Sequence, residues 1–309
     1  MNLFYKILRL LLLLNIFLHA QSIRDNHEID KGIMDISTSF EYQCSPNNFS
    51  LLDDLIEECH DSYYLYGAHK LIDFRIMKSI GIGQENDIYE MEEKYKNLSN
   101  QAQVYGISNK YLYYKFLNFV IRDYIEGYNT IKDDLYSLVN SHIIADDPIK
   151  KYVIALYMWQ LSAGKEEHLL YQNIIDELIE SNNEIKNTSA YAEYCYKKSM
   201  ELIDSQDYNN ALAYILQTKS LFKKKDLQNA DWNTRFDFII EYCQVMINEP
   251  NANDIMSLKR QFLKILNTDF GILLLDANTA LYISNMNDAF SYFELFDDAN
   301  EILFKSTRL

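Results

Sequence analysis

The chain has 309 residues, of which 29 are Lys or Arg and 45 are Asp or Glu, for a formal net charge of −16 at pH 7. This excess of acid argues against binding to nucleic acid or to an anionic membrane surface, because a phosphate backbone is held by clustered Lys and Arg. Only 8 Gly and 3 Pro interrupt the chain, whereas average usage would give roughly 20 and 15, so sheet-rich folds with many tight turns are disfavoured.

The chain begins with the pattern of a secretory signal peptide over residues 1–20. Two basic residues, Lys6 and Arg9, precede an apolar run, and Ala20 supplies a small residue at a cleavage point. The run is shorter than the roughly 20 residues that span a bilayer, which favours a cleaved leader over a retained anchor. We therefore expect a periplasmic or secreted protein, in which residues 21–47 form a linker or lead-in.

Helical periodicity continues from residue 48 onward, and short polar turns separate the expected helices. Gly81 and Gly83 mark one helix stop, Gly106 marks the next, and strand alternation is nowhere sustained. Because no compositional border interrupts residues 48–309, we predict one elongated all-α domain. Its predicted helices span residues 49–59, 62–79, 86–105, 108–124, 129–143, 148–163, 166–182, 189–204, 208–224, 230–248, 253–267, 272–293 and 296–306.

The four cysteines are too few for a disulfide framework, although an exported chain can still pair them. Cys195 and Cys243 fall in the first helices of successive expected pairs. A bridge between them is one alternative, and burial as two small apolar side chains is the favoured one. Cys44 in the lead-in has a similar choice between pairing with Cys59 and remaining a thiol.

Residues that could carry chemistry do not form a known catalytic or metal-binding pattern. His60 and His69 lack the spacing of a metal motif, so we predict no metal site and no cofactor. The tyrosine-rich runs at 63–66 and 111–114 suit either a helical core, which is favoured, or a binding surface. Adjacent acids are expected near helix starts, where capping explains them, at Asp53-Asp54, Asp133-Asp134, Asp146-Asp147 and Asp297-Asp298.

The stretch 192–222 shows the clearest internal plan, with two helices that meet at a turn before Tyr208. Small residues, Ser199 and Ala211, allow the two helix axes to approach, and Ile215 follows one turn after Ala211. This arrangement resembles a tetratricopeptide repeat, which has a small residue at position 8, Tyr at 17 and Ala at 20. Departures from the pattern occur at Lys198, Thr218 and Lys223. The resemblance implies a right-handed α-solenoid of stacked antiparallel helix pairs, stepped here at about 40 residues.

The resemblance also implies a concave groove that binds a protein or peptide through first-helix positions 2, 5, 9 and 12. These positions are held by Glu193, Tyr196, Met200 and Ile203 in this stretch, and by Leu281, Ser284, Asp288 and Ser291 in the last repeat. Tyr196 and Met200 lack the Lys and Asn with which some family members hold a C-terminal carboxylate. The expected lining is therefore apolar and aromatic with an acidic rim, unless some of these positions face neighbouring helices.

Together these features predict a non-enzymatic protein- or peptide-binding module that is exported from the cytoplasm. One version is the periplasmic sensing part of a signalling or transcription regulator, since the leader resembles those of Bacteroides-type bacteria. That version expects a membrane-anchored continuation beyond Leu309, because no polar capping helix follows the last apolar one. The alternatives are a free-standing envelope scaffold or chaperone-like binder and, less favoured, an all-helical hydrolase. We expect no nucleic-acid partner and no membrane insertion within the mature segment.

Overall fold

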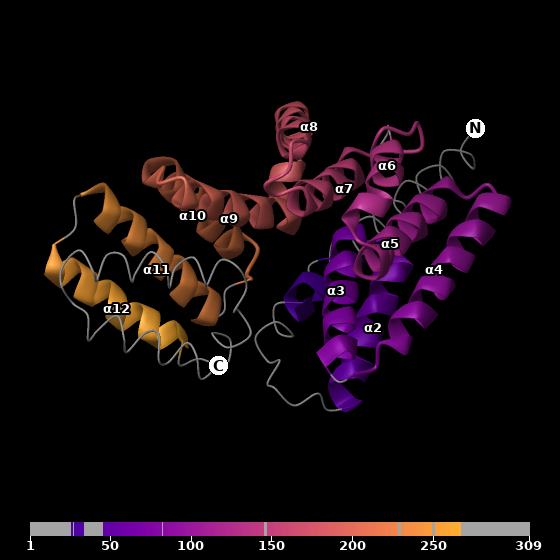
Figure 1. Ribbon diagram of the computed structural model, residues 1–309, viewed down its shortest axis with the longest axis horizontal. Coiled ribbons are helices and arrows are strands. Elements are labelled where there is room, and N and C mark those ends of the chain that lie inside the picture. The colour runs from indigo at the N-terminus through magenta and orange to yellow at the C-terminus, as the bar shows by residue number, and fades with distance from the viewer. Residues whose placement is uncertain are drawn as a thin grey trace, which may run out of the picture. The chain divides into compact units, whose positions relative to one another are not determined.

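The computed structural model describes residues 26, 28–33, 46–81, 83–144, 147–227, 230–248 and 251–266. All regular structure in these residues is helical (Figure 1), which confirms the all-α prediction. The predicted signal peptide, most of the lead-in and the last two predicted helices lie outside them. The helices are α2 (Pro46–Ser62), α3 (Leu65–Gly81), α4 (Asn86–Val104), α5 (Ser108–Glu126), α6 (Tyr128–Val139), α7 (Pro148–Leu161), α8 (His168–Ser181), the 3-10 turn η1 (Ile185–Asn187), α9 (Ser189–Asp204), α10 (Tyr208–Lys224), α11 (Ala230–Ile247) and α12 (Ala252–Leu266).

Helix ends follow local signals in the sequence. Gly106 follows α4 with a φ of 67°, a left-handed conformation that glycine adopts at little cost. α7 begins at Pro148, and the Asp147 side chain caps it by accepting a backbone hydrogen bond. The largest shift of a single helix end is in α6, which we expect to reach residue 143 but which ends at Val139. There the Asn140 side chain donates a hydrogen bond to a carbonyl of the last turn at 2.9 Å and so ends the helix.

Contacts among the described residues divide them into two compact units. The first comprises residues 46–185 and the short helical segment at 28–33, and the second begins at Lys186. The predicted single domain over residues 48–309 does not include this division. The boundary between the units falls at Ile185 and Lys186. No Gly or Pro lies next to it, so the composition of the chain does not mark it.

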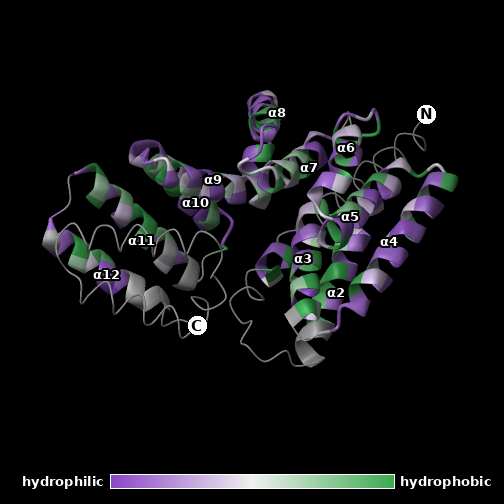
Figure 2. Cartoon of the chain, viewed as in Figure 1, coloured by the Kyte–Doolittle hydropathy of each residue, from purple (hydrophilic) through white to green (hydrophobic). Residues whose placement is uncertain are grey.

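In the first unit, α2 packs on α3, α4 on α5, α5 on α6 and α7 on α8, while α3 also contacts α5. α7 is buried on all sides, since every residue from Tyr152 to Trp159 is buried. α4 is mostly hydrophilic (Figure 2) and buries a single stripe that includes Ile88, Tyr95 and Ala102. No helix within the described ranges is both long and apolar enough to cross a membrane.

In the second unit, consecutive helices pack against each other from α9 through α12. Ser199 on α9 and Ala211 on α10 are both fully buried, as expected for small residues between two close helices. Ile215 lies with Ala211 in a hydrophobic cluster that also contains Phe236 and Tyr242 of α11. Adjacent helices thus pack in pairs as predicted, while the right-handed solenoid stays a prediction.

The three cysteines in the described residues, Cys59, Cys195 and Cys243, are buried free thiols. Burial raises the pKa of Cys195 and of Cys243 to about 12, so both resist conversion to the reactive thiolate. They occupy the core as small apolar side chains, the favoured alternative from sequence. Cys44, the suggested partner of Cys59, lies outside the described residues.

Candidate functional site

The residues predicted to line a groove on α9 are mostly in the interior of the second unit. Tyr196, Met200 and Ile203 are only 7%, 3% and 1% exposed, and all three belong to the hydrophobic cluster that α9 shares with α11. The Tyr196 ring packs edge-on against Phe236 with 6.3 Å between centroids. These positions face a neighbouring helix, which is the alternative that the sequence leaves open.

Glu193, the fourth predicted groove residue on α9, is half-buried. Its carboxylate lies 3.5 Å from the ammonium of Lys197, one turn later on the same helix. Ser284 and Asp288 lie outside the described residues. A ligand-binding role for these positions stays a prediction, and the described part of α9 offers a packed surface there.

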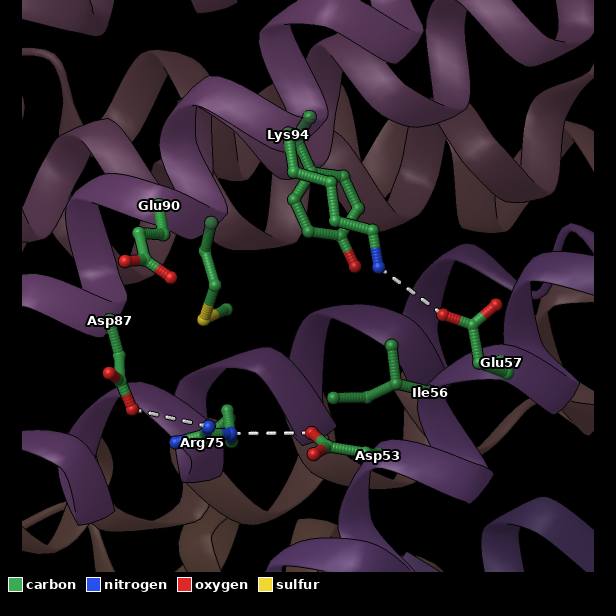
Figure 3. A pocket seen from close by; sticks show the side chains of 9 residues that line it. Asp53, Ile56, Glu57, Arg75, Asp87, Glu90 and Lys94 are labelled. Carbon is green, nitrogen blue, oxygen red and sulfur yellow. Dashed lines mark hydrogen bonds and ion pairs between the residues drawn. The ribbon is translucent and has the colours of Figure 1, made fainter.

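A cleft with a volume of about 480 Å³ lies between α2, α3 and α4 of the first unit (Figure 3). On α4 its lining residues follow the spacing i, i+3, i+4, i+7 and i+8 from Asp87, which places them on one helix face. The lining residues are Asp53, Ile56, Glu57, Arg75, Asp87, Glu90, Met91, Lys94 and Tyr95. Four carboxylates and two cations therefore surround an apolar and aromatic interior.

Arg75 joins the three helices at one side of the cleft. Its Nε lies 3.3 Å from Asp53 on α2, one Nη lies 3.3 Å from Asp87 on α4, and the other donates to Ser79 Oγ at 2.7 Å. The Arg75 side chain is 17% exposed, so these charge-assisted bonds are partly shielded from water. Asp53 lies in the interior of α2, so its interpretation as a helix-start acid is corrected to an inter-helix ion pair.

The opposite side of the cleft is held more loosely. Lys94 Nζ lies 3.3 Å from Glu57, but the two side chains are 53% and 64% exposed, so the pair contributes about 0–1 kcal/mol. The same ammonium lies 5.8 Å from the centre of the Tyr95 ring. Among the described residues Glu90 makes no ion pair or hydrogen bond, and Figure 3 shows its carboxylate on the same side of the cleft as Asp87.

The floor of the cleft continues into a buried hydrogen-bonded triad. Tyr95 is 2% exposed, and its hydroxyl lies 2.8 Å from His60 Nε2. On the other side of the imidazole, Nδ1 lies 2.8 Å from the hydroxyl of Tyr113. Burial lowers the pKa of His60 to about 4, because the charged imidazolium loses its hydration. The neutral ring then donates through one nitrogen and accepts through the other, so both tyrosine hydroxyls have a partner.

A second polar cluster links α3, α5 and α7. His69 Nε2 lies 2.9 Å from Asp73 Oδ2, an ion-pair distance without hydrogen-bond geometry. The Tyr157 hydroxyl donates to Asp123 Oδ2 at 3.3 Å. Burial raises the pKa of Asp123, the Tyr157 hydrogen bond opposes that rise, and the nearby charge of Asp73 adds to it. His69 and Tyr157 are buried, so this cluster holds helices together inside the unit and does not open to a ligand.

The cleft is the feature that the sequence interpretation misses. Its signal is present on α4, where Asp87, Glu90 and Lys94 share one helical face, but the partner charges come from two other helices. In the described residues no three His, Cys, Asp or Glu side chains are grouped so that they could hold a metal ion. A ligand in the cleft would meet the ion pairs of Arg75 and Lys94, the carboxylate of Glu90 and the ring of Tyr95.

No protein-family model, curated protein or solved structure matches the chain. The tetratricopeptide resemblance therefore depends on the residues around Ser199, Tyr208 and Ala211, and on the packing of α9 against α10.

Proposed function

We propose that the chain is a non-enzymatic helical-repeat module that binds a protein or peptide segment in the cleft between α2, α3 and α4. The observation that carries this proposal is the cleft itself, whose volume of about 480 Å³ falls in the range of ligand pockets. Its interior offers Ile56, Met91 and Tyr95 for apolar contact, and its rim offers charges for orientation. Protein recognition sites likewise combine apolar contacts with polar and charged groups.

Pairing of the rim charges favours binding over hydrolysis. Three of the four cleft carboxylates, those of Asp53, Glu57 and Asp87, are each within 3.3 Å of an Arg or Lys nitrogen. Carboxylate-based hydrolysis uses one carboxyl group as an acid and a second as a base or nucleophile across the substrate. Glu90 alone lacks a cationic partner among the described residues, so the cleft does not offer such a pair.

The predicted repeat architecture supports a binding function in general. Helix pairs with small residues between them, such as Ser199 and Ala211, stack into arrays that present extended binding surfaces.

We place this binding outside the cytoplasm because residues 1–20 have a signal-peptide pattern. The mass of the protein purified from the cell envelope tests this location, since cleavage after Ala20 would give a chain that begins at Gln21. A mass that includes the leader would contradict cleavage and favour the retained anchor.

A displayed library of random 12-residue peptides tests the binding function. We expect the protein to enrich a related set of peptides, and we expect Met91→Arg to abolish this enrichment because the new side chain fills the cleft. Tyr89→Arg is the matched control, since Tyr89 is exposed on the same helix and does not line the cleft. Failure to enrich any peptide family, or equal enrichment by the Met91→Arg variant, would overturn the proposal.

A further inference from the structure

The charges of the cleft define the chemistry of its ligand. We infer that the cleft receives a basic side chain, Arg or Lys, of a partner peptide, and that Glu90 is the carboxylate that pairs with it. The inference rests on the proposed binding function and adds the class of side chain that is recognised.

The balance of charge selects a cation. Four carboxylates face two cations in the cleft, and the Arg75 guanidinium is already bonded to Asp53, Asp87 and Ser79. An anionic ligand would have to compete with these bonds and approach a chain of net charge −16. A cationic ligand is instead attracted by the excess carboxylates of the cleft and by the negative charge of the chain.

Lys94 shows how an ammonium group fits the site. Its Nζ lies between the Glu57 carboxylate, at 3.3 Å, and the Tyr95 ring, at 5.8 Å from the ring centre. Cations are stabilised over such aromatic faces. Because Lys94 and Glu57 are both more than half exposed, their ion pair is weak, and Lys94 remains a like charge that opposes a cationic ligand at Glu90.

The apolar lining suits the stem of a basic side chain. Arg and Lys pack their methylene groups along apolar surfaces while the charged end stays near polar groups. Met91 provides most of this surface inside the cleft, beside the nearly buried Ile56, and the carboxylate of Glu90 lies at its edge. A peptide bearing Arg or Lys thus satisfies the interior and the unpaired charge together, which neither a purely apolar nor an acidic peptide does.

The test is an NMR titration of the whole protein with acetyl-Ala-Arg-Ala-amide. The ring nitrogen signals of His60 serve as the readout, because His60 is bonded to Tyr95 in the cleft floor. The citrulline version of the peptide has nearly the same shape without the charge, and we expect it to bind up to about fivefold more weakly. We expect Glu90→Gln to weaken the Arg peptide by about fivefold and Lys94→Met to strengthen it by about threefold.

Glu93→Gln is the matched control, since Glu93 is exposed on α4 outside the cleft and its loss changes the net charge equally. Equal binding of the Arg and citrulline peptides, or equal weakening by Glu90→Gln and Glu93→Gln, would overturn the inference. Glu90 is exposed, so unchanged melting of Glu90→Gln verifies that its fold is intact. If the library selects neutral or acidic peptides that Met91→Arg rejects, the binding function stands and the basic-side-chain inference falls.

Discussion

At the scale of single residues, the first unit is organised around tyrosines that meet a histidine in its interior. His60 makes edge contacts with the rings of Tyr95, Tyr113 and Tyr114, whose centroids lie 5.5, 5.5 and 5.7 Å away. Burial raises the pKa of Tyr95 and of Tyr113, so both hydroxyls stay protonated and can donate. One hydroxyl donates to the imidazole and the other accepts from it, so the neutral ring has a partner for both nitrogens.

This triad predicts a loss of stability in acid. The pKa of His60 falls from 6.5 in the unfolded chain to about 4 in the folded one, so between these values the unfolded state binds the extra proton. Stability therefore decreases as the pH falls from 6.5 to 4, by about 3 kcal/mol in total. Urea unfolding at a series of pH values measures this change in the free energy of unfolding.

The His60→Gln variant isolates the contribution, since a glutamine amide can also donate to one hydroxyl and accept from the other. Other groups, such as Asp123, titrate equally in both proteins, so the difference between the two curves belongs to His60. We expect this difference to change between pH 6.5 and 4 and to be constant above pH 7. Parallel curves over the whole range would show that His60 is not buried as a neutral ring.

Gly67 predicts a steric limit at the start of α3. A Cβ at this position would lie 2.6 Å from Cδ1 of Tyr64 and 3.0 Å from Sγ of Cys59. The Tyr64 ring cannot move aside easily, because its hydroxyl donates to the buried carboxylate of Asp30. Overpacking of this kind costs about 1–3 kcal/mol, whereas Gly→Ala in a helix otherwise gains about 1 kcal/mol. We therefore expect Gly67→Ala to lower the free energy of unfolding by up to about 2 kcal/mol.

The control for Gly67→Ala is Asn97→Ala, a change to the same residue at an exposed position of α4. We expect it to leave the melting temperature unchanged or slightly raised, since alanine has the higher helix propensity. Equal effects of the two substitutions would mean that Tyr64 and Cys59 do not restrict the space beside Gly67.

At the scale of helices, the sequence predicts well which segments are helical and where each helix ends, because both depend on residues that are adjacent in the chain. The end of α4 is marked by Gly106, and the start of α7 by Pro148 and the capping side chain of Asp147. All three lie within a few residues of the helix end that they define. The cleft depends instead on residues far apart: Arg75 pairs with Asp53, and His60 bonds Tyr113, 53 positions later. Periodicity shows which face of a helix is polar but does not show which other helix meets it.

The same limit explains the groove residues on α9. Helical spacing places Tyr196, Met200 and Ile203 on related faces, and the family resemblance assigns those faces to a ligand. The packing of α11 against the cluster buries them, and no local signal in α9 indicates this neighbour. The pairing of α9 with α10 can be predicted from sequence, because Ser199 and Ala211 indicate close packing between two helices that follow one another in the chain.

Ala211 provides the test of the α9–α10 pair. It is fully buried in the hydrophobic cluster, so Ala211→Phe has to displace its neighbours and should destabilise the protein by about 1–3 kcal/mol. Leu216→Phe on the same helix is the control, because Leu216 is 48% exposed and a larger ring can extend into solvent. Thermal unfolding measures both, and an unchanged midpoint for Ala211→Phe would contradict the observed register of the pair.

At the scale of the whole molecule, the predicted solenoid and the observed division into two units lead to different expectations for cooperativity. In a continuous array each repeat stabilises its neighbours, so a defect in one helix pair spreads along the stack. Two compact units, each with its own core, instead open with free energies of their own.

Hydrogen exchange measured by mass spectrometry distinguishes these expectations with the two core variants already described. Because Gly67 lies in the first unit and Ala211 in the second, we expect Gly67→Ala to speed exchange in peptides from α2 to α5 and to leave those from α9 to α12 unchanged. Ala211→Phe should speed exchange in peptides from α9 to α12 and leave those from α2 to α5 unchanged. The loss of protection, expressed as a free energy, should equal the loss of stability measured by unfolding. Faster exchange in both units from either substitution would mean that the chain opens as one cooperative array, as strong coupling between neighbouring repeats of a solenoid would produce.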